Sequence, residues 1–137
     1  VFDQFTKFCR RFQKSDSKWD AMISSGYNIK GFDNIIMALL CKKYGYTDKD
    51  GSQKLFHPMH TLDLMDICRM WFHATDDGPN GYSLESIRTY FGVPKDGAHR
   101  AMIDVEHTLL ILKRMMEFQK KLNVRYVPKF KDSFNVS

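Results

Sequence analysis

Two short strand-like segments, each followed by a helix-like segment, constrain the fold of this chain most. The first segment, residues 19–28, is apolar in its middle and is closed by Gly26, and the second is the extended piece at residues 57–63. Both are shorter than a typical helix, and apolar residues at helical spacing follow each of them. We therefore predict two strands in an α/β fold.

Five segments carry apolar residues at the 3.6-residue spacing of a helix, and we predict helices over residues 1–12, 32–44, 64–72, 83–92 and 98–122. Ser83 is a suitable N-cap for the fourth helix, and Gly92 is a suitable residue to end it. The last helix has one apolar stripe, made by Ala98, Ala101, Met102, Val105, Leu109, Leu112 and Met116.

The predicted elements form one domain, residues 1–137, because no repeat, low-complexity tract or linker divides them. Two strands are too few for a sheet that covers five helices. We therefore expect further strands upstream of Val1.

Composition limits the class of protein. An apolar fraction of 43% predicts a globular chain with a core, and no apolar run reaches the ~20 residues of a membrane-spanning helix. The three cysteines form no CxxC pair, which favours a reducing compartment such as the cytoplasm and no disulfide framework. The net charge of +5 is compatible with a polyanionic partner.

Two stretches near predicted helix starts carry candidate functional residues. Asp33 follows the first predicted strand, and His99 and Asp104 lie at the head of the last predicted helix. Side chains five residues apart do not share a helix face, so His99 and Asp104 converge only if His99 precedes the helix. Alternatively, His99 caps this helix, and each aspartate only stabilises the positive end of its own helix.

The segments "YNIKGFD" and "HRAMID" resemble the second and third motifs of the DEDDh 3′–5′ exonucleases. This family has an RNase H-like fold and includes proofreading subunits of bacterial replicases and several exoribonucleases. Its third motif, His-x-Ala-x-x-Asp, is matched by His99, Ala101 and Asp104, whereas the related tyrosine branch needs Tyr where this chain has Arg100. "HTLDLMDICR" and "YSLESIRTYFGV" also resemble family segments, in the family's order.

The resemblance implies a two-metal phosphodiesterase that shortens DNA or RNA from a single-stranded 3′ end. Asp33 and Asp104 would be two of four carboxylates that hold two Mg²⁺ or Mn²⁺ ions about 3.5–4 Å apart. His99 would be the general base. The implied substrate-binding residues are Asn28, Phe32, Arg100 and Ala101.

The chain departs from the family in one respect. The first family motif, Asp-x-Glu on a strand, supplies the other two carboxylates, and the one Asp-x-Glu here is Asp104–Glu106, on a predicted helix. We therefore expect this chain to be the back portion of an incomplete exonuclease domain, inactive by itself. The N-terminal portion could reach it as a separate segment.

Three other functions remain open from the sequence. One is a non-catalytic nucleic-acid-binding or assembly module with an exonuclease-like fold, and another is a basic globular domain whose motif matches are coincidental. The third is a zinc site, for which the candidate ligands would be His57, His60 and His107 with Cys68 or Asp63. The zinc site is the weakest of the three, because no second closely spaced ligand pair follows the HPMH segment.

Overall fold

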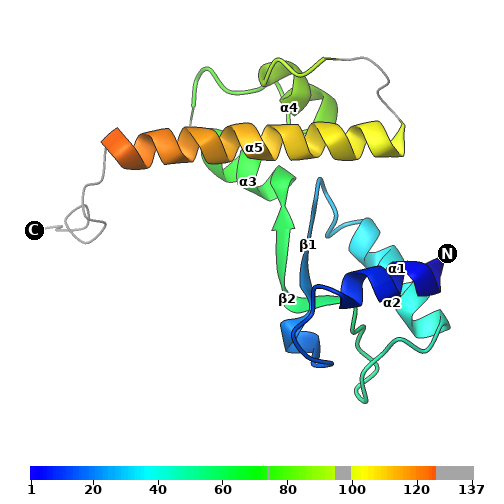
Figure 1. Cartoon of the computed structure of the whole chain (residues 1–137). Helices are drawn as coiled ribbons and strands as arrows, with labels where there is room; N and C mark the ends of the chain where they lie inside the picture. Colours follow the sequence, from blue (N-terminus) through cyan, green and yellow to red (C-terminus); the bar gives the residue numbers. More distant parts are fainter. Residues whose placement is uncertain (74, 95–99, 126–137) are drawn as a thin grey trace, which may run out of the picture.

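The computed structural model describes residues 1–73, 75–94 and 100–125. In chain order the elements are α1 (Phe2–Arg10), the 3₁₀ helix η1 (Lys18–Asp20), β1 (Met22–Gly26), α2 (Asp33–Lys43), β2 (Phe56–Asp63), α3 (Leu64–Phe72), α4 (Leu84–Tyr90) and α5 (Ala101–Arg125). Figure 1 shows α5 lying across one end of the sheet, with α1 and α2 near the other.

The two predicted strands are confirmed, and they pair in parallel. Ser24 of β1 is in register with Thr61 of β2, and Gly26 is in register with Asp63. The pairing is irregular between Met22 and Ser24. Within the described ranges the sheet contains these two strands alone, so the fold is mixed α/β with a small parallel sheet. A two-stranded sheet needs packing helices for stability, and two apolar clusters supply this packing.

The first cluster joins α3, α4 and α5, and the second joins α1, α2 and the segment before β2. The first consists of Leu64, Cys68, Ile87, Val93, Ile111 and Met115. The second consists of Cys9, Cys41 and Leu55. All three cysteines are buried and free. No helix in the described part of the chain is long and apolar enough to cross a membrane.

The predicted bounds of α3 are confirmed, and α4 spans Leu84–Tyr90, within the predicted range of 83–92. The two residues predicted to begin and end α4 act as expected. Ser83 precedes α4 with an extended backbone, and its hydroxyl accepts a hydrogen bond from the backbone N–H of Ser86 at 3.1 Å. Gly92 follows α4 with a φ of +63°, a conformation that glycine adopts without the strain of a side chain.

Replacing Ser83 by alanine is expected to lower the free energy of unfolding by about 0.5–2 kcal/mol, because the N–H of Ser86 loses its acceptor. Urea unfolding followed by circular dichroism measures this change. An unchanged unfolding midpoint would contradict the assignment of Ser83 as the cap.

The sequence placed the buried face of α5 wrongly. Met102, Val105 and Leu109, which belong to the predicted apolar stripe, are 69%, 61% and 50% exposed. Over residues 101–121, the part of α5 whose burial is described, the buried residues are instead Thr108, Ile111 and Met115, because α3 and α4 pack against that face. The described part of α5 begins at Ala101; residues 98 and 99, where the predicted helix starts, lie outside the described ranges.

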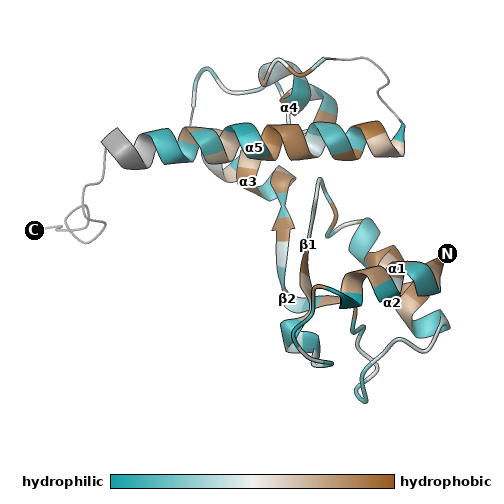
Figure 2. Ribbon diagram, in the orientation of Figure 1, coloured by the Kyte–Doolittle hydropathy of each residue, from teal (hydrophilic) through white to brown (hydrophobic). Residues whose placement is uncertain are grey.

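Other apolar side chains are also exposed on α1 and α2. Figure 2 shows hydrophobic residues along both helices. The exposed members are Phe5, Phe8, Ile35, Ile36 and Leu39, each at 39% or more. An apolar face of this kind normally packs against another element, and none of the described elements covers it.

Candidate active site

A cavity of about 750 Å³ lies along β1. Its lining includes all of β1, the start of α2 and the N-terminal half of α5. The residues from the helices are Asp33, Asn34, Met37, Leu84, Ala101, Asp104, Val105, Thr108, Leu109 and Leu112, of which Leu84 is the one from α4. Consecutive side chains of a strand point to opposite faces, so a lining that includes five consecutive residues of β1 indicates a cavity along the strand's edge.

Asp33 and Asp104, which are far apart in the sequence, line this same cavity. Asp33 is the first residue of α2, and Asp104 lies in the first turn of α5. Two helix N-termini therefore bring a carboxylate each to one cavity. The helix dipole favours a negative charge at both positions, so each aspartate also stabilises its own helix.

The β1–α2 loop, which leads to Asp33 at the cavity, packs the Ile29 side chain closely against Gly26. A Cβ atom on Gly26 would lie 2.3 Å from Cγ2 of Ile29, so any larger residue here would force the Ile29 side chain to move. The backbone N–H of Asn34 then donates to the carbonyl of Ile29 at 2.9 Å, which ties the loop to the first turn of α2.

The α5 side of the cavity is built around Asp104. Its N–H donates to the carbonyl of Arg100 at 3.0 Å, and its own carbonyl accepts from the Thr108 hydroxyl at 2.7 Å. Ala101 lies one turn earlier, is exposed, and also lines the cavity. Its assignment to substrate binding stays a prediction.

Three other predicted site residues, Asn28, Phe32 and Arg100, are not among the described residues that line the cavity. Asn28 and Phe32 lie in the loop before α2; both are exposed, Phe32 at 63%. Arg100 is exposed directly before α5. Their assignment to substrate binding stays a prediction. His99, the predicted general base, lies outside the described residues.

The donor set of this cavity fits a hard divalent cation only in part. Carboxylate oxygens are the ligands that Mg²⁺ and Mn²⁺ prefer, and the cavity has two carboxylates in its lining. Among residues 1–73, 75–94 and 100–125 no group of three or more His, Cys, Asp or Glu side chains could hold a metal ion. Further ligands would have to come from elsewhere.

The zinc ligands proposed from the sequence are not brought together. The rings of His57 and His60 stack with centroids 4.2 Å apart, and Nδ1 of His57 accepts from the backbone N–H groups of Met59 and His60. Cys68 lies in the separate α3–α5 cluster, where burial raises the pKa of its thiol to about 11. Cys68 is therefore a protonated core residue at neutral pH rather than a zinc-binding thiolate.

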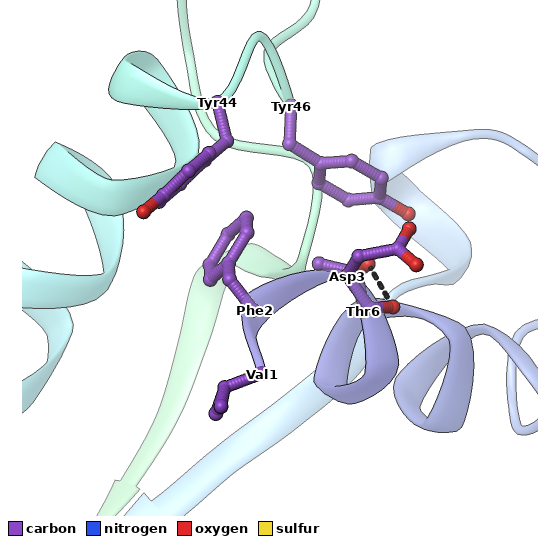
Figure 3. Close-up of a pocket in the computed structure, with 6 residues that line it drawn as sticks. All are labelled: Val1, Phe2, Asp3, Thr6, Tyr44 and Tyr46. Atoms are coloured by element: carbon purple, nitrogen blue, oxygen red, sulfur yellow. Dashed lines mark hydrogen bonds between the residues drawn. The ribbon is translucent and has the colours of Figure 1, made fainter.

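A second, smaller cavity of about 330 Å³ lies between α1 and the end of α2 (Figure 3). Phe2 stacks on Tyr44 there, with ring centroids 4.9 Å apart. The single carboxylate in its lining, Asp3, pairs with Lys7 at 2.8 Å. This cavity has no second acidic group, so it fits a metal-dependent reaction less well than the first.

Sequence reasoning named Asp63 only as an alternative zinc ligand and missed its role as a buried carboxylate next to the site. Asp63 ends β2 and accepts hydrogen bonds from the loop that leads to Asp33. A local signal was present, because an aspartate before an apolar helical run is a typical N-cap. That signal predicts the contact with α3 but not the contact with the loop.

Comparisons with known proteins find no relative. No protein-family model matches the sequence, and neither the curated proteins nor the solved structures include a significant match.

Proposed function

We propose that this chain is the back portion of a metal-dependent 3′–5′ exonuclease of the DEDDh type, with an RNase H-like fold. The observation that carries the proposal is the presence of Asp33 and Asp104 in the lining of one cavity. The resemblance of "YNIKGFD" and "HRAMID" to two family motifs supports it, since each motif contributes one of these carboxylates.

In this proposal Asp33 and Asp104 would hold Mg²⁺ or Mn²⁺, and the chemistry that the bound ions would supply is activation of water and stabilisation of the departing phosphodiester oxygen. His99 takes the proton from the attacking water. Arg100 contacts a phosphate, Asn28 and Phe32 shape the pocket for the terminal nucleotide, and Ala101 leaves room for the substrate. The substrate is a single-stranded 3′ end of DNA or RNA, held by stacking and backbone contacts.

The missing carboxylates would come from an acidic strand paired with the free edge of β1. This edge has no strand partner in the described structure, and the cavity runs along it. Residues i and i+2 of a strand share one face, so an Asp-x-Glu strand would present both carboxylates on the same side. Pairing at an open sheet edge is a common mode of strand addition. Without this strand we expect weak metal binding and no catalysis.

The proposed exonuclease belongs to a reducing compartment such as the cytoplasm. The support is the state of the cysteines: Cys9, Cys41 and Cys68 are all free and buried. Burial raises the pKa of each thiol, so the thiols resist oxidation as long as the chain stays folded.

Calorimetric titration with Mn²⁺, with an acidic Asp-x-Glu peptide supplied in place of the missing strand, tests the metal site. Asp104→Asn and Asp33→Asn should each weaken Mn²⁺ binding by at least about tenfold. Loss of a group that only hydrogen-bonds to a metal ligand already has an effect of this size. Asp3→Asn is the matched control, since Asp3 is an exposed carboxylate on α1. Equal Mn²⁺ affinity in the wild-type protein and both site variants would show that these aspartates are not ligands.

A synthetic peptide tests the missing strand. It would carry Asp-x-Glu among alternating apolar residues, and its control would carry Asn-x-Gln. With the acidic peptide, Mn²⁺ and a 3′-labelled single-stranded oligonucleotide, we expect label release that the control peptide does not support. Tight Mn²⁺ binding without label release under these conditions would contradict the exonuclease proposal.

The second candidate function is a non-catalytic nucleic-acid-binding or assembly module. Among the residues that the structure describes, no third metal-ligating side chain joins the two carboxylates, which favours such a module. The exposed apolar residues of α1, α2 and α5 also suit a protein that docks on a partner. Oligonucleotide binding that is unaffected by chelation of divalent ions and by Asp104→Asn would favour this module over the nuclease.

A further inference from the structure

We infer that Asp63 is a positioning residue that holds the β1–α2 loop and, through it, Asp33 at the mouth of the cavity. This inference rests on the proposed function, because it assigns a purpose to the placement of Asp33. It adds a residue that belongs neither to the two motifs nor to the cavity lining.

The geometry around Asp63 supports this assignment. The side chain lies at the end of β2 and is 3% exposed. One carboxylate oxygen, Oδ1, accepts from the backbone N–H of Asn28 at 2.8 Å and of Met65 at 3.1 Å. The other, Oδ2, accepts from the N–H of Lys30 at 3.2 Å. One buried carboxylate thus joins the start of α3 to the loop before α2.

The loop needs such an anchor because its backbone is strained. Asn28 has a φ of +55°, the left-handed region that non-glycine residues adopt at an energetic cost. The carboxylate of Asp63 binds the N–H of this same residue. A surface ion pair between Lys30 and Asp66, at 2.7 Å, adds a weaker connection between the loop and α3.

The restraint continues from the loop to α2. Ile29 lies between the two loop residues whose N–H groups donate to Asp63. Its carbonyl accepts a hydrogen bond from the backbone N–H of Asn34 at 2.9 Å. Asn34 directly follows Asp33 in the first turn of α2. The position of the Asp33 carboxylate therefore depends on a loop whose conformation is held from β2.

Both oxygens of Asp63 are used as acceptors, so an amide cannot replace the carboxylate. In Asp63→Asn one oxygen becomes an NH₂ group, which would face a backbone N–H, donor against donor. We expect the amides of Asn28 or Lys30 to exchange faster with solvent, and the NMR signals of Asp33 and Asn34 to shift. Mn²⁺ affinity should fall by about 10–100-fold, as for other groups that orient a metal ligand.

Two controls separate positioning from helix capping. Asp66→Asn removes the neighbouring surface carboxylate and should leave Mn²⁺ affinity within about twofold of wild type, because an exposed pair contributes little. Ser83→Ala removes the cap of α4 and should lower stability without moving the signals of Asp33.

The outcomes distinguish this inference from the proposed function. If Asp63→Asn only destabilises the protein, with Asp33 signals and Mn²⁺ affinity as in Ser83→Ala, Asp63 is only a helix cap and the inference is wrong. If the wild-type protein binds no Mn²⁺ even with the acidic peptide present, the proposed metal site fails. Whether Asp63 holds the loop is then still decided by two measurements in Asp63→Asn. These are the hydrogen-exchange rates of the Asn28 and Lys30 amides and the shifts of the Asp33 NMR signals.

Discussion

Replacement of His99 by alanine is expected to slow 3′-end hydrolysis by about 10²–10⁴-fold, with folding intact. In the proposed mechanism His99 accepts the proton of the attacking water, and no other side chain is assigned this task. A free imidazole has a pKa of about 6.5, which suits proton transfer near neutral pH. The rate should be measured with the acidic peptide and Mn²⁺ present.

The matched control is His73→Ala, because His73 is exposed after the end of α3 and is absent from the cavity lining. It should keep the wild-type rate. Circular dichroism of both variants verifies folding. If His99→Ala retains the full rate while Asp104→Asn abolishes it, the metal site stands and the assignment of the base is wrong.

Truncation of Ile111 to alanine is expected to lower the free energy of unfolding by about 2–5 kcal/mol. Ile111 is 0% exposed and lies in the cluster that joins α5 to α3 and α4. The substitution leaves a cavity between three helices, and a loss of this size is a large part of the ~5–15 kcal/mol that stabilises a typical domain.

Leu109→Ala on the same helix is the control, because Leu109 is 50% exposed. It should change stability less, since this residue is already half exposed to solvent in the folded protein. Urea unfolding of both variants gives the comparison. Equal losses for Ile111→Ala and Leu109→Ala would contradict the buried face assigned to α5.

The bounds of several elements could be predicted because their signals lie within a few residues of one another. The α3 helix begins directly after Asp63, and α4 lies between the cap Ser83 and Gly92. These are local hydrogen bonds and backbone preferences, so they operate largely independently of the rest of the fold. The two strands were predicted for a similar reason, as short apolar or extended segments between turns.

The candidate site was predicted in part. The motifs named Asp33, Asp104 and Ala101, and these three residues line one cavity. The motifs did not name Asp63, because its hydrogen bonds to Asn28 and Lys30 join segments more than 30 residues apart. A pattern within one segment contains no information about such a contact.

Sequence alone determined where α3, α4 and the two strands lie and that Asp33 and Asp104 come near helix starts. Caps, turns and apolar runs of a few residues are sufficient for this. Only the tertiary structure decided that α5 buries Ile111 and leaves Leu109 exposed, and that the two aspartates face one cavity. The physical reason is that burial depends on which distant segment packs against a face, whereas helical spacing identifies only that such a face exists.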